Sequence, residues 1–281
     1  MLKISYIQVK NNLHKKESII TFLVLMLLIM INYISNVIAF EGYDILNMFH
    51  LLKITLISYD RTNFNGTNTL IFTQLYPLLV VLPAGMILQK EKRSGISTYI
   101  ASRTGYIRYY ISRLLASFIT TFIIFTVPFI IEMFINLLSF PFGANGNMAN
   151  LSIYDPEYIN AVNNYLFSSL YGYSIYLYYI LSVILLGFVS GIFGALSIAL
   201  SEIFKFKYDV LILAPVFFFL NASIAFSASF EGMGYSVKWF DYLLLFNEKS
   251  KNPLYLPLII LLSAFIIVFS IIFSQKKDID K

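Results

Sequence analysis

The 281-residue sequence contains no cysteine, only two histidines and a single tryptophan, and just 12% of its residues are charged. Without cysteine the chain can form neither disulfides nor thiolate metal sites. The two histidines, His14 and His50, are not part of an HExxH motif, so the residues of a zinc hydrolase are missing. None of the 13 glycines is followed by lysine, which excludes a GxxxxGKS or GxxxxGKT nucleotide-binding loop. We therefore expect a protein that is not an enzyme and that holds no metal or cofactor on its own chain.

What the sequence has in excess is apolar residues, which make up 58% of the chain. Soluble domains carry about 25% charged residues, so the composition indicates a membrane protein. Six stretches are long enough to cross a hydrocarbon core of about 30 Å, which takes about 20 apolar residues in a helix. Runs of this length without two-residue alternation favour helices over the strands of a barrel. The predicted fold is an all-α membrane protein, a single transmembrane domain of residues 1–281, with spans at about 18–40, 69–88, 114–138, 175–200, 209–229 and 254–274.

The distribution of positive charge orients these six predicted helices. An even number of spans places both termini on one side, and 15 of the 20 lysines and arginines fall on that side. Because positively charged loops stay in the cytoplasm, both termini are expected there. The net charge of +5 then reflects orientation and contact with lipid headgroups, and does not indicate nucleic-acid binding. We expect a multi-pass protein embedded in the lipid bilayer of a bacterial cell membrane.

The segments outside the predicted spans leave no room for a soluble domain. The N-terminal segment repeats apolar residues every three or four positions, at Leu2, Tyr6, Val9 and Leu13. This spacing is typical of a short amphipathic helix lying on the membrane, which we call the elbow helix. Residues 41–68 are expected to form an outer connection between the first and second spans.

The longest inner connection, residues 89–113, begins with the basic stretch QKEKR. Behind it, Ile96, Tyr99 and Ile100 fall near helical spacing, and Gly105 is expected to separate this short helix from the third span. A surface helix with an apolar edge needs cover, which a protein docking from the cytoplasm would supply. The alternative is that the basic residues only anchor the connection by the positive-inside rule.

The same connection resembles a segment of a known family. The sequence EKRSG, which begins at Glu91, an apolar helical patch and then SRTGYIRYYISRLL resemble the region after the second span of ABC-2 type permeases, the membrane subunits of a class of ATP-driven exporters. Glu91 and Gly95 fall on that family's acidic residue and glycine, and Arg113 falls where a basic residue commonly opens the third span. Ile96 stands where the family frequently has threonine.

The resemblance implies a coupling helix at about Gly95 to Ser102 that docks on a separate ATPase subunit. It also implies a unit of two permease chains and two soluble ATPase chains, in which ATP and Mg are bound by the ATPase. The second permease is either a copy of this chain or a different one. The residues expected to take part in ATPase coupling are Glu91, Lys92, Arg93, Gly95, Ile96, Tyr99 and Ile100.

Few residues inside the predicted spans are polar. Glu132 is the only acidic or basic one, and it is either a carboxylate near the outer boundary of the membrane or part of an exit gate. Asn221 and Ser223 in the fifth span either line a path or bond neighbouring helices. The same two alternatives hold for Asn32 and Asn36 in the first span.

Prolines and small residues give two further predictions about the helices. Pro77 and Pro83 remove hydrogen bonds in the second span and are candidate bending points. Gly187, Gly191 and Ala195 lie four residues apart, a pattern that lets helices approach closely. This close contact is either internal to the chain or between two chains.

The function that these features favour is export of a hydrophobic or amphipathic cargo, with a peptide preferred over a lipid or a drug. An ion-coupled carrier usually needs charged groups near the middle of the membrane, and none is predicted there. Aromatic residues, at 17% of the chain, suit the walls of a path for such cargo. The alternative is a non-transporting membrane anchor or sensor that acts together with an ATPase, as an immunity protein would.

Overall fold

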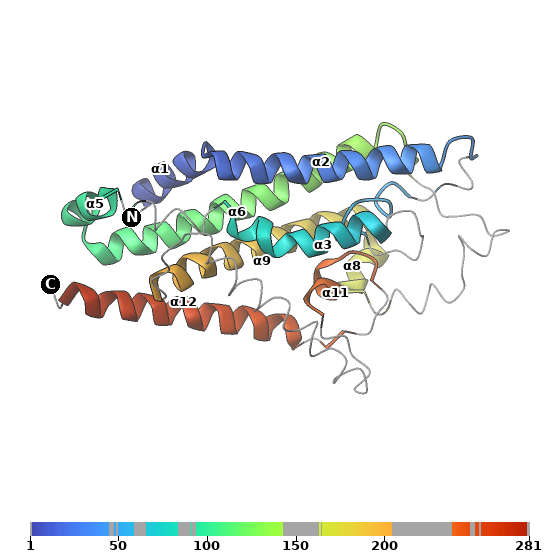
Figure 1. The fold of residues 1–281 in the computed structure, drawn as a ribbon. Coiled ribbons are helices and arrows are strands. Elements are labelled where there is room, and N and C mark those ends of the chain that lie inside the picture. Colours follow the sequence, from blue (N-terminus) through green and yellow to red (C-terminus); the bar gives the residue numbers. More distant parts are fainter. Residues whose placement is uncertain are drawn as a thin grey trace.

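The computed structural model of the chain describes residues 2–44, 48, 50–58, 66–83, 91, 94–142, 163, 165–203, 238–247, 251–252 and 254–279. In these residues the structure has nine α-helices and no β-strand (Figure 1). They are α1 (Leu2–Leu13), α2 (Lys16–Ala39), α3 (Gly66–Val81), α5 (Ile96–Thr104), α6 (Tyr106–Asn136), α8 (Ser168–Tyr173), α9 (Ile175–Ile203), α11 (Trp239–Leu243) and α12 (Tyr255–Ile279).

Four of these helices are long and apolar enough to cross a membrane, namely α2, α6, α9 and α12 as far as Gln275. They coincide with the first, third, fourth and sixth predicted spans. α3 is the described part of the second predicted span, and its 16 residues are too few for a full crossing. The fifth predicted span, 209–229, lies outside the described residues. The described part of the chain is therefore an all-α bundle with four candidate membrane helices.

Glycine and proline explain several helix limits. α5 lies between two glycines with left-handed backbone angles, Gly95 with φ 73° and Gly105 with φ 83°, which other residues adopt only at a cost. The predicted break at Gly105 is thus confirmed. Pro77 lies inside α3, whereas Pro83 lies in the turn after it. Pro83 therefore follows a helix end, as prolines commonly do, and does not bend a described helix.

The close contact between α9 and α6 depends on glycines of α9, which carry no side chain. A Cβ atom added at Gly191 would lie 2.8 Å from the ring of Phe118 and 2.9 Å from its carbonyl oxygen. Gly187 faces Thr126 at similarly close range, and Ala195 is buried beside the first turns of α6. The small-residue stripe read from the sequence therefore meets α6 within the same chain.

The two ends of the bundle carry different elements. Both chain termini lie at one end together with α1 and α5, and α8 and α11 lie at the other (Figure 1). We call these the terminal end and the distal end.

The connection between α2 and α3, predicted at 41–68, is in part packed into the bundle. His50–Ser58 lies buried within the distal end, and Leu51, Leu56 and Ile57 have no exposed surface. Polar side chains of α2, α3 and α6 bond the backbone of this segment. These bonds allow a segment without regular helix to be buried, because its backbone groups keep their partners.

Candidate functional site

α5 is a short helix whose two sides face different surroundings. Ile96 is 48% exposed and Tyr99 59%, whereas Ile100 packs against a buried cluster that includes Tyr109. The guanidinium of Arg103 lies 4.5 Å from the centre of the Tyr99 ring, in a cation–π contact. The outward side of α5 is therefore an apolar and aromatic surface with one positive charge.

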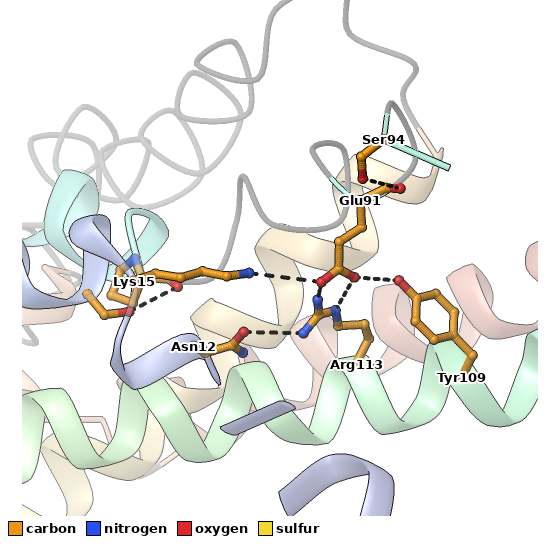
Figure 2. Close-up of polar contacts among 8 residues, drawn as sticks. Asn12, Lys15, Glu91, Ser94, Tyr109 and Arg113 are labelled. Carbon is orange, nitrogen blue, oxygen red and sulfur yellow. Dashed lines mark hydrogen bonds and ion pairs between the residues drawn. The ribbon is translucent and has the colours of Figure 1, made fainter. Parts of the chain in front are cut away.

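The carboxylate of Glu91, five residues before Ile96, is bonded to α6 (Figure 2). The Nε and Nη2 atoms of Arg113, on α6, both bond the carboxylate of Glu91, and the Nε contact to Oε2 is 2.9 Å. The Tyr109 hydroxyl, one helical turn before Arg113, donates to the same oxygen at 2.5 Å. On the other side, the Ser94 hydroxyl donates to the backbone oxygen of Glu91 at 3.2 Å. Arginine thus holds the carboxylate with two parallel contacts, the strongest arrangement for this pair.

The same arginine reaches the N-terminal helix. Its Nη1 atom donates to Asn12 Oδ1 of α1 at 3.2 Å, and Asn12 is 1% exposed. Lys15, between α1 and α2, places its Nζ atom 3.9 Å from Oε1 of Glu91 (Figure 2). One cluster therefore joins α1, the residue before α2, Glu91 and the first turns of α6. We call these residues (Asn12, Lys15, Glu91, Tyr109 and Arg113) the joint cluster.

The burial of the joint cluster makes its charges energetically significant. Arg113 is 2% exposed, and the side chain of Glu91 is 15% exposed. Removing one partner of a buried ion pair costs about 3–5 kcal/mol, whereas an exposed pair contributes about 0–1 kcal/mol. Glu91 and the first part of α6 are therefore held to each other, so that a displacement of one carries the other with it.

A second carboxylate lies close to the joint cluster, on α9. Glu202 is 1% exposed and accepts the Tyr106 hydroxyl at 3.2 and 3.3 Å from its two oxygens. Tyr106 is the first residue of α6, directly after Gly105. The start of α6 is thus bonded both to Glu91 and to the central helix of the bundle.

The structure brings together only part of the set predicted from sequence. Glu91, Gly95 and the outward residues of α5 form one site, while Lys92, Arg93, Asn221 and Ser223 lie outside the described residues. Glu132 is 19 residues beyond Arg113 on α6, about 28 Å along the helix, so it belongs to the distal end. It is 1% exposed, so its carboxylate lies inside the bundle. Its burial is explained by the partners described below.

Sequence reasoning missed most partners in the joint cluster. Tyr109 and Arg113 are four residues apart and so share one face of α6, a spacing that indicates a common partner. Asn12 was hidden because the elbow helix was read for its apolar residues, whereas its polar side faces α6. Glu202 lies two residues beyond the end of the predicted fourth span, although α9 continues to Ile203.

The joint cluster is made of charged and polar side chains that connect α1, Glu91 and α6. Within the part of the chain that the structure describes, no group of three or more histidine, aspartate or glutamate residues could hold a metal ion. Comparison with protein-family models, with curated proteins and with solved structures finds no match to this chain.

Proposed function

We propose that this chain is the membrane subunit of an ATP-driven exporter of the ABC-2 permease type, and that α5 is the coupling helix on which a separate ATPase subunit docks. The observation that carries the proposal is the combination of an exposed Ile96 and Tyr99 on α5 with a buried ion pair that ties Glu91, five residues before Ile96, to Arg113 of α6. An apolar edge that lies outside the bilayer, as the proposed topology requires of α5, calls for a protein partner.

The proposed topology has six spans with both termini in the cytoplasm. Four apolar helices support part of this topology, and the location of both termini and α5 at one end is compatible with it (Figure 1). The ATPase would then approach the terminal end, and cargo would leave at the distal end.

In the proposed mechanism, closure of two ATPase subunits around ATP and Mg presses on α5. The joint cluster passes this displacement to α6 and α1, because Arg113 bonds Glu91 and Asn12 at once. Tyr106 passes it to α9 through Glu202. Two permease chains, identical or different, enclose the path between them.

The proposed cargo is hydrophobic or amphipathic, with a peptide preferred. Apolar and aromatic residues dominate the four candidate membrane helices, so a path among them has few fixed charges to bind a polar cargo. An ATPase rate of the purified complex that rises with peptides from a panel supports this cargo. A rate that responds only to lipids or drugs makes those the cargo instead.

The docking of the ATPase is tested by purifying the tagged chain from its own membranes in mild detergent. We expect a soluble protein with a nucleotide-binding P-loop to be recovered with the wild type. Replacing Ile96 and Tyr99 by Asp should reduce that recovery about tenfold or more, since charges on both apolar contacts oppose docking at a small interface.

A matched control is Tyr6→Asp on α1, which is 70% exposed at the same end of the bundle but not on α5. This variant should recover the ATPase as the wild type does. Recovery of an intact chain without any ATPase points to a membrane anchor, and undiminished recovery with both Asp substitutions shows that the ATPase binds elsewhere.

A further inference from the structure

The segment His50–Ser58, here called the plug segment, occupies the distal end of the bundle without forming a helix. It lies between the last turns of α2 and α6, and none of its described residues is more than partly exposed. Backbone without regular structure is tolerated at membrane depth only where protein or a water-filled cavity surrounds it. Two turns inside the plug segment pair part of its backbone, Lys53 N–H with the His50 oxygen at 2.8 Å and Ser58 N–H with the Thr55 oxygen at 3.0 Å. Other backbone groups of the segment depend on neighbouring elements.

α2 and α6 each contribute two polar residues four positions apart. Asn32 and Asn36 of α2 both donate to the backbone oxygen of Ile54 at 2.9 Å. On α6, Asn136 donates to the Leu51 oxygen at 3.3 Å. These three amides are at most 1% exposed, so they form hydrogen bonds with the plug segment and not with solvent.

Two further elements complete the attachment. Thr69, near the start of α3, donates to the backbone oxygens of Leu56 and Ser58 at 3.0 and 3.2 Å. The backbone N–H of Leu245, just after α11, donates to Ile57 at 2.9 Å. The plug segment is thus hydrogen-bonded to α2, α3, α6 and the residue Leu245 after α11.

Glu132 differs from these groups because it accepts a hydrogen bond from the plug segment. Its Oε1 atom accepts the backbone N–H of Leu56 at 2.6 Å and an amide hydrogen of Asn32 at 3.5 Å. Its Oε2 atom is buried and, among the described residues, has no hydrogen-bond partner, and the same is true of the amide oxygens of Asn36 and Asn136. Buried oxygens of this kind are normally hydrogen-bonded, and leaving them unpaired destabilises the bound position of the plug segment. The free energy needed to release the segment is therefore lower than if all three were paired.

Building on the proposed function, we propose that the plug segment closes the exit at the distal end and leaves its site when cargo passes, with Glu132 as the positioning residue that holds it closed. Opening breaks the Leu56 contact to Glu132 and the Ile54 contacts to α2. The carboxylate then faces the path at its outer end.

The absence of cysteine from the chain makes this testable with single reporter thiols. Ser58 is 2% exposed and its hydroxyl has no partner among the described residues, so Ser58→Cys removes no hydrogen bond. In the purified chain in detergent, we expect this thiol to react slowly with a membrane-impermeant maleimide. Glu132→Ala should speed the reaction about tenfold, the effect of losing one buried hydrogen bond on a local opening equilibrium. Glu132→Gln, which keeps an acceptor oxygen, should stay within about twofold of the wild type.

Two other reporter thiols serve as controls, one for loss of the fold and one for the intrinsic reactivity of an exposed thiol with the maleimide. Ser197→Cys in α9 has no exposed surface and should stay unreactive, whereas Tyr173→Cys is 82% exposed and should react quickly in every background. If Glu132→Ala also makes Ser197→Cys reactive, that variant has lost its fold and cannot test the plug segment. Asn36→Ala then replaces it, because this milder change removes a single hydrogen-bond donor to Ile54. Faster reaction of Ser58→Cys in Asn36→Ala supports the proposal. Unchanged reaction of Ser58→Cys in a folded variant overturns it.

The link to transport is tested in the complex with the co-purified ATPase. Adding ATP and Mg should raise the reactivity of Ser58→Cys and leave that of Ser197→Cys unchanged. A complex in which ATP turnover leaves Ser58→Cys unreactive overturns the plug and leaves the proposed function standing. If no ATPase is recovered, the proposed function fails, while the comparison of Glu132→Ala with Glu132→Gln still decides whether Glu132 holds the segment.

Discussion

At the scale of single residues, the terminal end depends on a buried guanidinium, that of Arg113, whose partners Glu91 and Asn12 come from two distant parts of the chain. Glu91→Ala removes the acceptor of two Arg113 nitrogens and of the Tyr109 hydroxyl. We expect it to lower the free energy of unfolding by about 3–5 kcal/mol, because Arg113 is left charged and buried. Glu91→Gln keeps one acceptor oxygen and should lose less. Chemical unfolding of the purified chain in detergent measures both.

Glu41→Ala provides the control for the loss of a carboxylate, since Glu41 is an exposed residue just after α2. It should leave the free energy of unfolding within about 0.5 kcal/mol of the wild type. Equal losses for Glu91→Ala and Glu91→Gln would show that the charge alone matters, and no loss in either would contradict the ion pair.

His50, at the start of the plug segment, should make the stability of the chain sensitive to acid. Burial lowers the pKa of His50 to about 4, and repulsion from Lys53 adds to this, while a hydrogen bond with the Phe142 backbone opposes it. In an unfolded chain histidine titrates near 6.5. Its contribution to stability is thus complete above pH 6.5 and is lost as the pH falls towards 4.

We expect the melting temperature of the wild type in detergent to fall over the range from pH 6.5 to 4 by more than that of His50→Gln. Glutamine can form hydrogen bonds but does not titrate, so the difference between the two profiles isolates His50 from the carboxylates. Parallel profiles would contradict a buried neutral imidazole.

Single residues also show where sequence reasoning stops. Glu132 could be identified as the one charge in a predicted span, but its burial could not be predicted, because its partner Leu56 is 76 residues away in the sequence. Asn32 and Asn36 could be identified as polar, but their acceptor, Ile54, belongs to a segment with no helical or strand pattern. Contacts between segments that are distant in the sequence produce no local pattern of residues, so they cannot be predicted from periodicity.

At the scale of helices, replacing a glycine where α9 approaches α6 has two opposing effects on stability, a gain in helix propensity and a loss from overpacking. Gly191→Ala gains about 1 kcal/mol in helix propensity but places a methyl group 2.9 Å from the Phe118 carbonyl oxygen, which as backbone moves little. Overpacking of this kind costs about 1–3 kcal/mol, so we expect a lower melting temperature. Gly172→Ala in α8 meets nothing within 4 Å and should leave the melting temperature unchanged or raise it. A Gly191→Ala variant as stable as Gly172→Ala would contradict the packing.

The helices themselves were the predictable part of the fold. Long apolar runs predict α2, α6, α9 and α12 because a membrane helix must bury its own backbone bonds, a requirement that depends only on local sequence. The glycines at both ends of α5 act in the same local way. The burial of the plug segment was not predictable because several of its backbone oxygens are bonded by side chains of other elements.

At the scale of the whole molecule, the outer surface is that of a protein in lipid. α12 carries a row of apolar side chains that are about half exposed or more, among them Leu258, Leu261 and Phe265. α2 does the same with Leu23 and Leu27. Such a continuous apolar surface is unfavourable in water but costs nothing against hydrocarbon. The apolar helices thus indicate a membrane environment without fixing which end of the bundle is in the cytoplasm.

Orientation is decided by where single thiols react in intact cells. Tyr99→Cys and Tyr6→Cys are exposed at the terminal end, and Tyr43→Cys and Tyr173→Cys at the distal end. Because an impermeant maleimide cannot cross the membrane, we expect it to label only the distal pair until the cells are permeabilised. The bias of lysine and arginine towards the terminal end is the physical reason for this expectation. If Tyr99→Cys is labelled in intact cells, α5 lies outside, beyond the reach of any cytoplasmic ATPase, and the coupling function is lost together with the direction of export.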